Sequence, residues 1–403
     1  MVGHKIQILF SPAETGIALR LAIGKKPEDI IAQVKESKLR GRGGAGFPTG
    51  LKWELVQQAK GERKFVVCNA DEGEPGTFKD RILLTDHPCK IFEGMAICGY
   101  AVGAQNGVVY LRAEYRYLRE GLVNAIKKMK ESNYLGKNIM GSGFNFDIEI
   151  HLGAGAYVCG EETALLESLE GKRGEARNKP PYPTECGYMG CPTVVNNVET
   201  FCYVPAIMTK GAQWFSEIGT MESTGSKLFS ISGDVAKPGV YELAMGSTVD
   251  VVLQLVGAKD TKAVQVGGAS GICVAEKDFN KPISFESLPP GGSIIVFNKS
   301  RDMLYVLKNF MEFFVEESCG QCTPCREGTY RLLQGVEMME QGRCSIHYLH
   351  TLRDLAQTML ISSKCGLGQL APNPFLSIID NFKGEILARD RVARNSKKTP
   401  VVR

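Results

Sequence analysis

The chain has 403 residues, of which 43% are hydrophobic and 23% charged, and its formal net charge is +4. This composition is typical of a soluble globular protein of roughly two to four domains, and the small charge without a basic run argues against nucleic-acid binding. The apolar start, Ile6 to Phe10, is too short for a signal peptide, and no apolar run is long enough to span a bilayer. We therefore expect a cytoplasmic protein without direct membrane insertion, whose thirteen cysteines stay reduced.

The first part of the chain, residues 1–225, is predicted to form an α/β domain. A helix is expected over Pro27–Ser37, where apolar residues follow helical spacing after a proline. A Pro/Gly-rich passage, Lys179–Pro192, predicts a long ordered loop. Three apolar segments predict strands separated by helical segments, an alternation typical of an α/β layer: Lys64–Asn69, Gly107–Arg112 and Phe146–His151.

The rest of the chain divides into two smaller domains and a tail. Residues 226–300 predict a small α+β domain, because short β segments alternate there with turns, at Leu228–Ser232, Ala263–Val266 and Ser293–Phe297. Residues 301–385 predict a helical bundle. Its first helix would bury one apolar face, formed by Met303, Leu307, Phe310 and Phe314. Residues 386–403 are expected to be a solvated C-terminal tail.

A glycine-rich segment follows the first predicted helix, with a formal GxGxxG pattern at Gly41, Gly43 and Gly46. The dinucleotide-binding Rossmann turn needs a strand before these glycines, whereas the preceding segment here is predicted to be helical. Backbone amides exposed by glycines could still bind phosphate, with Arg42 or Lys52 neutralising its charge. Phosphate binding and a plain glycine-rich turn are both compatible with this segment.

Acidic residues follow two of the predicted strands. Asp71, Glu72 and Glu74 come directly after the first strand, at the end where α/β folds bind ligands. A solvated acidic turn and a divalent-cation site are the alternatives for this string. Glu161 and Glu162 follow a second glycine turn and open a predicted helix, where the helix dipole alone would favour negative charge.

Four cysteines in the helical domain predict a metal centre. Cys319, Cys322 and Cys325 form a CxxCxxC run, and Cys365 follows forty residues later. Three close thiolates and one distant thiolate are typical of a 4Fe-4S cluster. Structural zinc is the alternative, although zinc sites more often pair two CxxC halves. Cys186 and Cys191 could also be ligands, but the sequence offers them no third partner.

Five segments together resemble one family, the NADH-oxidising flavoprotein subunits of respiratory complex I, NAD-dependent hydrogenases and NAD-dependent formate dehydrogenases. The similarity extends over roughly residues 28–385. It implies a Rossmann-like FMN domain, a soluble-ligand-binding β-grasp domain and a helical bundle that carries the 4Fe-4S cluster. The segments that carry the resemblance are residues 39–53, 69–81, 155–166, 195–200 and 317–328.

The resemblance also implies which residues bind FMN and NAD(H). The FMN phosphate would be held by Gly41, Arg42, Gly44 and Lys52. The flavin would be lined by Asn69, Asp71, Tyr157, Gly160, Glu161, Asn196, Asn197 and Thr200. The NAD(H) site would be bordered by Phe47, which would stack on the nicotinamide nucleotide, and by Glu72, Glu74, Glu162, Lys179 and Tyr182. Carboxylates there can bond ribose hydroxyls and repel the extra phosphate of NADPH.

The implied activity is hydride transfer between NAD(H) and FMN, followed by single-electron transfer to the cluster, with no side chain acting as nucleophile or general base. The high cysteine count favours a hydrogenase-type complex. Complex I and formate dehydrogenase are the alternatives within the family, and a non-catalytic electron-transfer scaffold is the alternative from another class. The implied partners are a thioredoxin-like 2Fe-2S subunit and a catalytic iron-sulfur subunit. Extra iron-sulfur domains found in some hydrogenase relatives are not evident, so a minimal form is expected.

Overall fold

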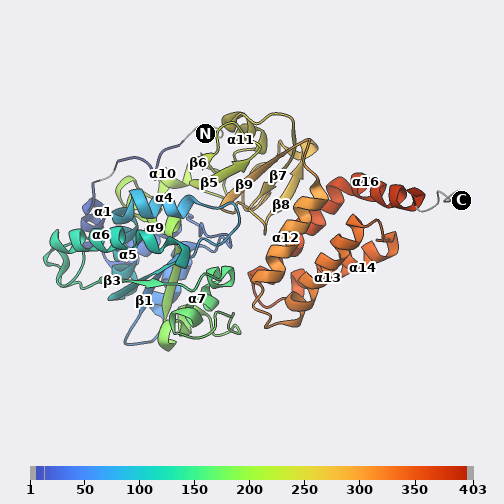
Figure 1. Ribbon diagram of the computed structural model, residues 1–403. Helices are drawn as coiled ribbons and strands as arrows, with labels where there is room; N and C mark the ends of the chain where they lie inside the picture. The colour runs from blue at the N-terminus through green and yellow to red at the C-terminus, as the bar shows by residue number, and fades with distance from the viewer. Residues whose placement is uncertain (1–5, 13, 397–403) are drawn as a thin grey trace, which may run out of the picture.

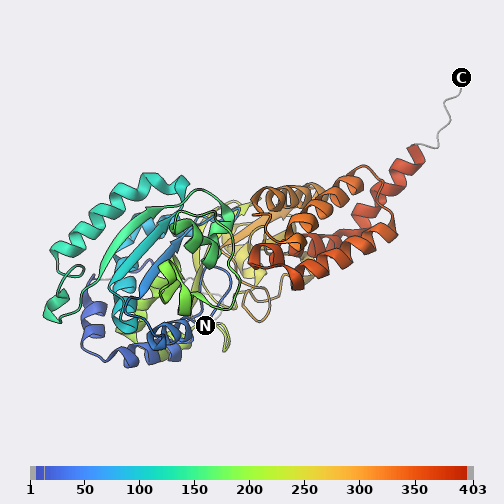
Figure 2. The same ribbon diagram turned by 90° about the horizontal axis from the view of Figure 1, so that it is seen from below.

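The computed structural model describes residues 6–12 and 14–396, shown in Figure 1. Three regions follow one another along the chain: an α/β region up to residue 218, a middle region of residues 219–300, and a helical region from residue 301 onward. Figure 2 shows that the molecule is elongated, with the α/β region at one end, the helical region at the other and the middle region between them.

Four parallel strands form the first sheet, in the order β3-β2-β1-β4. Asn69 of β1 lies opposite Asn197 of β4, so the carboxyl ends of these two strands are side by side. The predicted strands and the α/β layer are confirmed, and β4 is a strand that periodicity did not predict. The strands are β1 (Phe65–Ala70), β2 (Asn106–Leu111), β3 (Asp147–Leu152) and β4 (Thr193–Asn197).

Both faces of this sheet are covered. Successive side chains of β1 point to opposite faces, so they belong to two different cores. Val66 and Cys68 belong to the core shared with α5 (Pro88–Val102) and α9 (Val198–Lys210). Phe65 and Val67 belong to the core shared with α7 (Glu162–Leu169). The other helices of the region are α1 (Ile17–Ile23), α2 (Pro27–Glu36), α3 (Thr49–Gln58), α4 (Lys79–Asp86), α6 (Arg119–Glu131), α8 (Pro183–Cys186) and α10 (Ala212–Ser216).

The observed helices of this region test two predictions, one of a helix and one of a loop. The helix predicted over Pro27–Ser37 is α2 and is confirmed. The passage Lys179–Pro192 is not a loop throughout, since it contains α8 and the 3₁₀ turn Tyr188–Gly190. Pro183 begins α8, a position where proline is favourable because its missing N–H has no partner in a helix.

A five-stranded mixed sheet forms the middle region, in the order β6-β5-β9-β7-β8. β5 and β9 are parallel, and the other neighbouring pairs are antiparallel. The helix α11 (Val249–Val256) contributes Val252 to the core beside the sheet. The three predicted strands are confirmed, and β6 and β8 are additional. The strands are β5 (Ser226–Gly233), β6 (Gly239–Ala244), β7 (Thr261–Val266), β8 (Ile272–Ala275) and β9 (Ser293–Asn298).

The helical region buries the apolar face predicted for its first helix, including Met303, Leu307 and Phe314. The last helix, α16, continues to Ser396 and so crosses the expected start of a tail at residue 386; residues 397–403 lie outside the described residues. The helices are α12 (Met303–Glu317), α13 (Thr323–Glu340), α14 (Ile346–Ser362), α15 (Gly366–Leu370) and α16 (Pro372–Ser396). None of the helices in the described part of the chain combines the length and apolarity needed to cross a bilayer.

Candidate functional site

The glycine-rich loop, residues 41–46, connects α2 to α3 and is closed by its own backbone. Gly41 N–H donates to the Phe47 carbonyl at 2.9 Å, and Thr49 N–H donates to the Leu39 carbonyl at 2.9 Å. The Arg40 guanidinium donates to the Gly46 carbonyl at 2.7 Å. A helix precedes the loop, so the expectation that this is not a standard Rossmann turn is confirmed.

The loop has one open face, at Gly44. The φ angle of Gly44 is +126°, and no atom lies within 4 Å of the position that a Cβ would occupy. Gly43 lies against β4 instead, where a Cβ would be 3.1 Å from the Cβ of Asn197. The backbone at Gly44 can therefore approach an anion closely, as phosphate binding by glycine loops requires.

Arg42 is held by hydrogen bonds to other parts of the chain. Its guanidinium is buried and donates to the Thr224 carbonyl at 2.7 Å. Its backbone N–H donates to the Thr200 hydroxyl at 2.9 Å. The Arg42 side chain therefore joins the loop to the middle region, and its contact with the FMN phosphate stays a prediction. Thr200 likewise holds the loop through its hydroxyl.

Polar side chains stand at the ends of β1 and β4, and one of them, Asn69, bonds the turn Tyr157–Gly160, named η3. The Asn69 amide donates to the Gly160 carbonyl at 2.9 Å. The Asn197 amide donates to Asp80 at 2.7 Å. The Asn196 side chain accepts from the buried indole of Trp53 at 3.0 Å. Most residues predicted to line the flavin thus gather at one edge of the sheet.

Asp71 is a half-buried acid at the same edge, and one of its oxygens is buried and unsatisfied. Its Oδ2 has no hydrogen-bond partner among the described residues, and it is 3.7 Å from the position that a Cβ on Gly160 would occupy. Burial raises the pKa of Asp71 to about 7. An unpaired buried oxygen is costly, so this position fits a ligand that brings an N–H donor, as a flavin ring does.

A chain of alternating charges runs beside the glycine loop. Lys52 Nζ lies 2.7 Å from Glu162, and Lys179 Nζ lies 3.8 Å from Glu162 and 2.7 Å from Glu161. Glu161 also accepts from the first amides of α7, so it caps that helix as the dipole argument allowed. Burial opposes its ionisation, but Lys179 and these amides lower the pKa of Glu161. Phe47 lies at the rim, 43% exposed, with its ring 5.7 Å from Lys52 Nζ.

Tyr182 is the other predicted residue at this rim. It is 52% exposed and caps the N-terminus of α8. An exposed aromatic ring is available to a ligand, so the structure leaves Tyr182 in place as a candidate.

Two of the predicted NAD(H)-site carboxylates, Glu72 and Glu74, have hydrogen-bond partners within the chain. Glu72 is buried and accepts from the backbone N–H of Asp80 at 2.9 Å and from the Tyr115 hydroxyl at 3.0 Å, so it caps α4. Glu74 accepts from the Tyr157 hydroxyl at 2.5 Å and from the backbone and hydroxyl of Ser270 at 2.9 Å each. Burial raises the pKa of both carboxyls. Both carboxyls are therefore already hydrogen-bonded within the chain, and their place at the edge of the NAD(H) site stays a prediction.

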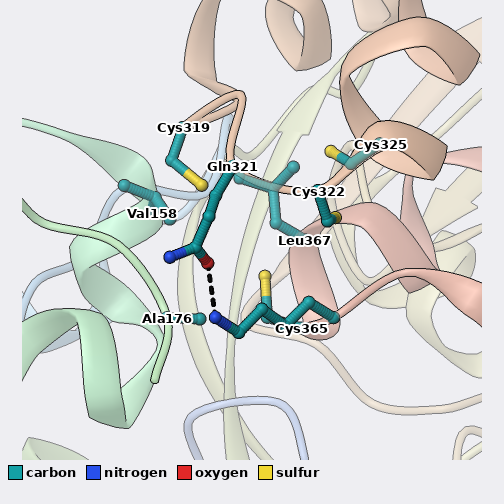
Figure 3. A pocket seen from close by; sticks show the side chains of 9 residues that line it. Val158, Ala176, Cys319, Gln321, Cys322, Cys325, Cys365 and Leu367 are labelled. Atoms are coloured by element: carbon teal, nitrogen blue, oxygen red, sulfur yellow. Dashed lines mark hydrogen bonds between the residues drawn. The ribbon is translucent and has the colours of Figure 1, made fainter. Parts of the chain in front are cut away.

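The four predicted cluster cysteines line one pocket (Figure 3). Cys319 follows the end of α12, Cys322 directly precedes α13, Cys325 lies in the first turn of α13, and Cys365 directly precedes α15. All four cysteines thus lie at or next to a helix end. Burial raises the pKa of the Cys325 thiol to about 11 and also raises that of Cys365, so metal binding would have to release their protons.

A 4Fe-4S cluster and a single zinc ion make different demands on the positions of the four thiols. A single zinc ion gathers its sulfurs within about 4 Å of each other, because Zn–S bonds are about 2.3 Å long. Among the described residues, no three Cys, His, Asp or Glu side chains gather closely enough to hold one metal ion. In a cubane cluster each thiolate binds a different iron atom, so the four sulfurs lie farther apart than they do around one zinc ion. Cys186 and Cys191 do not line this pocket.

The turn η3 joins the sheet edge to the cysteine pocket. Val158 lines the pocket, and its neighbour Tyr157 donates its backbone N–H to Glu317 of α12 at 2.9 Å. Arg173, from the loop after α7, donates to the Cys319 carbonyl at 2.8 Å. Sequence reasoning missed Val158, Arg173 and Glu317, because no local pattern distinguishes these contacts from ordinary packing.

Comparisons with known proteins match two regions of the chain to family models. The family "Nuo51 FMN-binding domain" matches residues 34–206, and the "NADH-ubiquinone oxidoreductase-F iron-sulfur binding region" matches residues 305–389. Residues 207–304 lie outside both matches.

Two curated relatives and one solved structure are similar over most of the chain. The NAD-reducing hydrogenase HoxS subunit alpha of Cupriavidus necator is 50% identical, over 89% of this chain and 60% of its own length. An NADH-quinone oxidoreductase subunit of Rhizobium meliloti is 45% identical, over 92% of this chain and 91% of its own length. The crystal structure of an NAD⁺-reducing [NiFe]-hydrogenase in the H₂-reduced state superposes with a TM-score of 0.90 at 41% identity, covering 96% of this chain and 68% of that chain.

Proposed function

The chain belongs to the family of FMN- and 4Fe-4S-binding flavoprotein subunits found in NADH-quinone oxidoreductases and NAD-reducing hydrogenases, and we propose that it oxidises NADH within a larger complex. The observation that carries this proposal is the turn η3, which borders both the sheet edge with Asp71 and the pocket of four cysteines. A hydride acceptor at one side of this turn and an iron-sulfur cluster at the other would be close enough to exchange electrons.

The roles of the residues follow from their positions. FMN, when bound, supplies the ability to accept a hydride and release its two electrons singly. The open backbone at Gly44 and the ammonium of Lys52 would hold its phosphate, with Gly41 closing the loop. Asp71 and the backbone of Gly160 would orient the ring through hydrogen bonds. The protein contributes orientation and charge, and no side chain needs to act as nucleophile or base.

The nucleotide substrate would lie at the rim of the same edge. The exposed ring of Phe47 offers a stacking surface, and Tyr182 is exposed as well. The carboxylate of Glu162 and the ammonium of Lys179 could form hydrogen bonds with ribose hydroxyls. On this proposal, the four cysteine thiolates hold the cluster: Cys319, Cys322, Cys325 and Cys365.

We propose that the middle region is the expected β-grasp domain. Its strand order, read by position along the region, is 2-1-5-3-4, with the first and last strands parallel at the centre and one helix after the first hairpin. The proposed domains cover residues 1–225, residues 226–300 and the residues from 301 onward, with the last domain expected from the sequence to end at residue 385. The continuity of α16 to Ser396 argues for ending the last domain beyond residue 385.

The host complex is proposed to be of the hydrogenase type. The 50% identity to the HoxS alpha subunit supports this choice, although the chain spans 60% of the length of that relative. The complex I assembly is the second candidate, favoured by the 91% coverage of the NADH-quinone oxidoreductase relative. Formate dehydrogenase is the third. In each case a thioredoxin-like 2Fe-2S subunit and a catalytic iron-sulfur subunit would be the partners, in the cytoplasm.

The function is tested with the single chain loaded with FMN and iron-sulfur cluster. We expect NADH to bleach the flavin absorbance and to reduce ferricyanide, because a hydride acceptor and a one-electron carrier suffice for that reaction. We expect no hydrogen, formate or quinone activity from the single chain. A chain with bound FMN that NADH does not bleach would instead be a non-catalytic scaffold, and hydrogen evolution by the single chain would contradict the proposed division of labour.

Glu162→Gln is expected to weaken discrimination against NADPH. The substitution removes one negative charge next to Lys52 and Lys179, leaving two lysines that can attract the 2′-phosphate. We expect the ratio of kcat/KM for NADH over NADPH to fall about tenfold. Glu167→Gln is the matched control. Glu167 lies farther along α7 and is paired with Arg177, so its substitution removes a negative charge away from Lys52 and Lys179. A ratio that is unchanged in Glu162→Gln would remove the selectivity role from this residue.

A further inference from the structure

The middle region touches the glycine loop although it lies outside the family's FMN-binding match. Lys227 of β5 donates from Nζ to the Arg42 carbonyl at 3.0 Å. The Thr224 carbonyl accepts from the Arg42 guanidinium at 2.7 Å. Both ends of Arg42 are thus fixed by one short segment of the middle region, about 180 positions later in the sequence.

Phe285 holds the loop from a second side. A Cβ at Gly46 would be 2.3 Å from the Phe285 ring, so glycine at this position lets the ring lie directly against the backbone. The Arg40 guanidinium lies 4.1 Å from the centre of the same ring. The backbone N–H of Phe285 donates to the Ser223 hydroxyl at 3.0 Å, which ties this contact to the segment that carries Thr224.

Lys227 also connects the loop to the end of β4. Its fully buried ammonium lies 3.0 Å from Glu199, and Glu199 lies 2.9 Å from Lys79. Lys79 donates to the Asn197 side chain at 3.3 Å. Buried charges are tolerated only when their partners are well placed, so this network leaves the Arg42 carbonyl little freedom to move.

We propose that Lys227 and Phe285 are positioning residues for FMN: they hold the glycine loop in the conformation whose open face binds the phosphate. This inference rests on the proposed FMN-binding function. If the loop is already ordered, FMN binding does not have to supply the free energy of ordering it. The contacts of Lys227 and Phe285 would therefore strengthen FMN binding although neither side chain touches the cofactor. The effect is specific to the phosphate, because the ring of the flavin would lie at the sheet edge and not in the loop.

The test compares FMN with riboflavin, which lacks the phosphate. In the full chain, Phe285→Ala is expected to weaken FMN binding about tenfold, measured by quenching of flavin fluorescence, and to leave riboflavin affinity unchanged. Phe285→Tyr keeps the ring and is expected to restore FMN affinity. Phe279→Ala is the control: Phe279 packs against the core of the middle region itself, and its loss is expected to leave the affinity for both flavins unchanged.

A second variant tests the buried contact. Lys227→Met is expected to weaken FMN binding more than riboflavin binding, with Lys262→Met as the control, because Lys262 of β7 pairs with Glu385 of α16. Unchanged FMN affinity in Phe285→Ala, or an equal loss for FMN and riboflavin, would overturn the inference. A wild-type chain that binds no FMN would overturn the proposed function instead. If Lys227→Met does not fold, the comparison of Phe285→Ala with Phe285→Tyr decides.

Discussion

Gly44→Ala is expected to abolish tight FMN binding while the iron-sulfur cluster and the fold persist. The φ angle of +126° at Gly44 is one that L side chains rarely adopt, and forcing a side chain into such a conformation costs about 1–3 kcal/mol. The new methyl group would also project from the open face of the loop, where a phosphate must approach the backbone. We expect the Kd for FMN to rise at least about 100-fold, which corresponds to about 2.7 kcal/mol.

Gly136→Ala separates strain from ligand contact. Gly136 also has a positive φ angle, +99°, and no atom within 4 Å of its Cβ position, but it lies in the turn before β3. Both variants should lower the midpoint of thermal unfolding by a similar amount, whereas only Gly44→Ala should lose FMN, as isothermal titration would measure. An equal loss of FMN affinity in the two variants would assign the effect to strain alone.

The features that could be predicted from the sequence are those encoded by local spacing. The CxxCxxC run places three thiolates around one helix start, and a buried strand shows as a run of apolar residues such as Phe65–Cys68. Both patterns can be recognised in the sequence because the structures they form depend on few contacts with distant residues. β6 is interrupted by Glu242, and β8 is only four residues long, so pairing with neighbouring strands decides that these segments are strands.

The direction of individual side chains could not be predicted in the same way. Arg42 and Glu74 have the residue types expected for anion and ribose binding, yet their partners Thr224 and Ser270 are 182 and 196 positions away. Glu72 caps a helix that begins only seven residues later, but an acid before a helix is compatible with capping and with ligand binding alike. Residue type and position at a strand end therefore define candidates, and tertiary contacts select among them.

Cys365→Ala is expected to eliminate the 4Fe-4S cluster. The substitution removes one of the four thiolates that line the pocket, and a cubane cluster bound by three protein thiolates is readily lost or rearranged. The reduced-state electron paramagnetic resonance signal should disappear. FMN should stay bound, because the glycine loop and Asp71 lie on the other side of η3. Flavin bleaching by NADH should persist, while reduction of a one-electron acceptor through the cluster should be lost.

Cys344→Ala provides the matched control for this variant. Cys344 is a buried cysteine of the same helical region that does not line the pocket. Its substitution therefore removes the packing of a cysteine side chain without removing an iron ligand. Iron content, sulfide content and the resonance signal should be unchanged in Cys344→Ala and lost in Cys365→Ala. A folded Cys365→Ala chain that keeps the wild-type signal would disprove the ligand assignment. Loss of the signal in both variants would show that the helical packing, and not the fourth thiolate, limits cluster assembly.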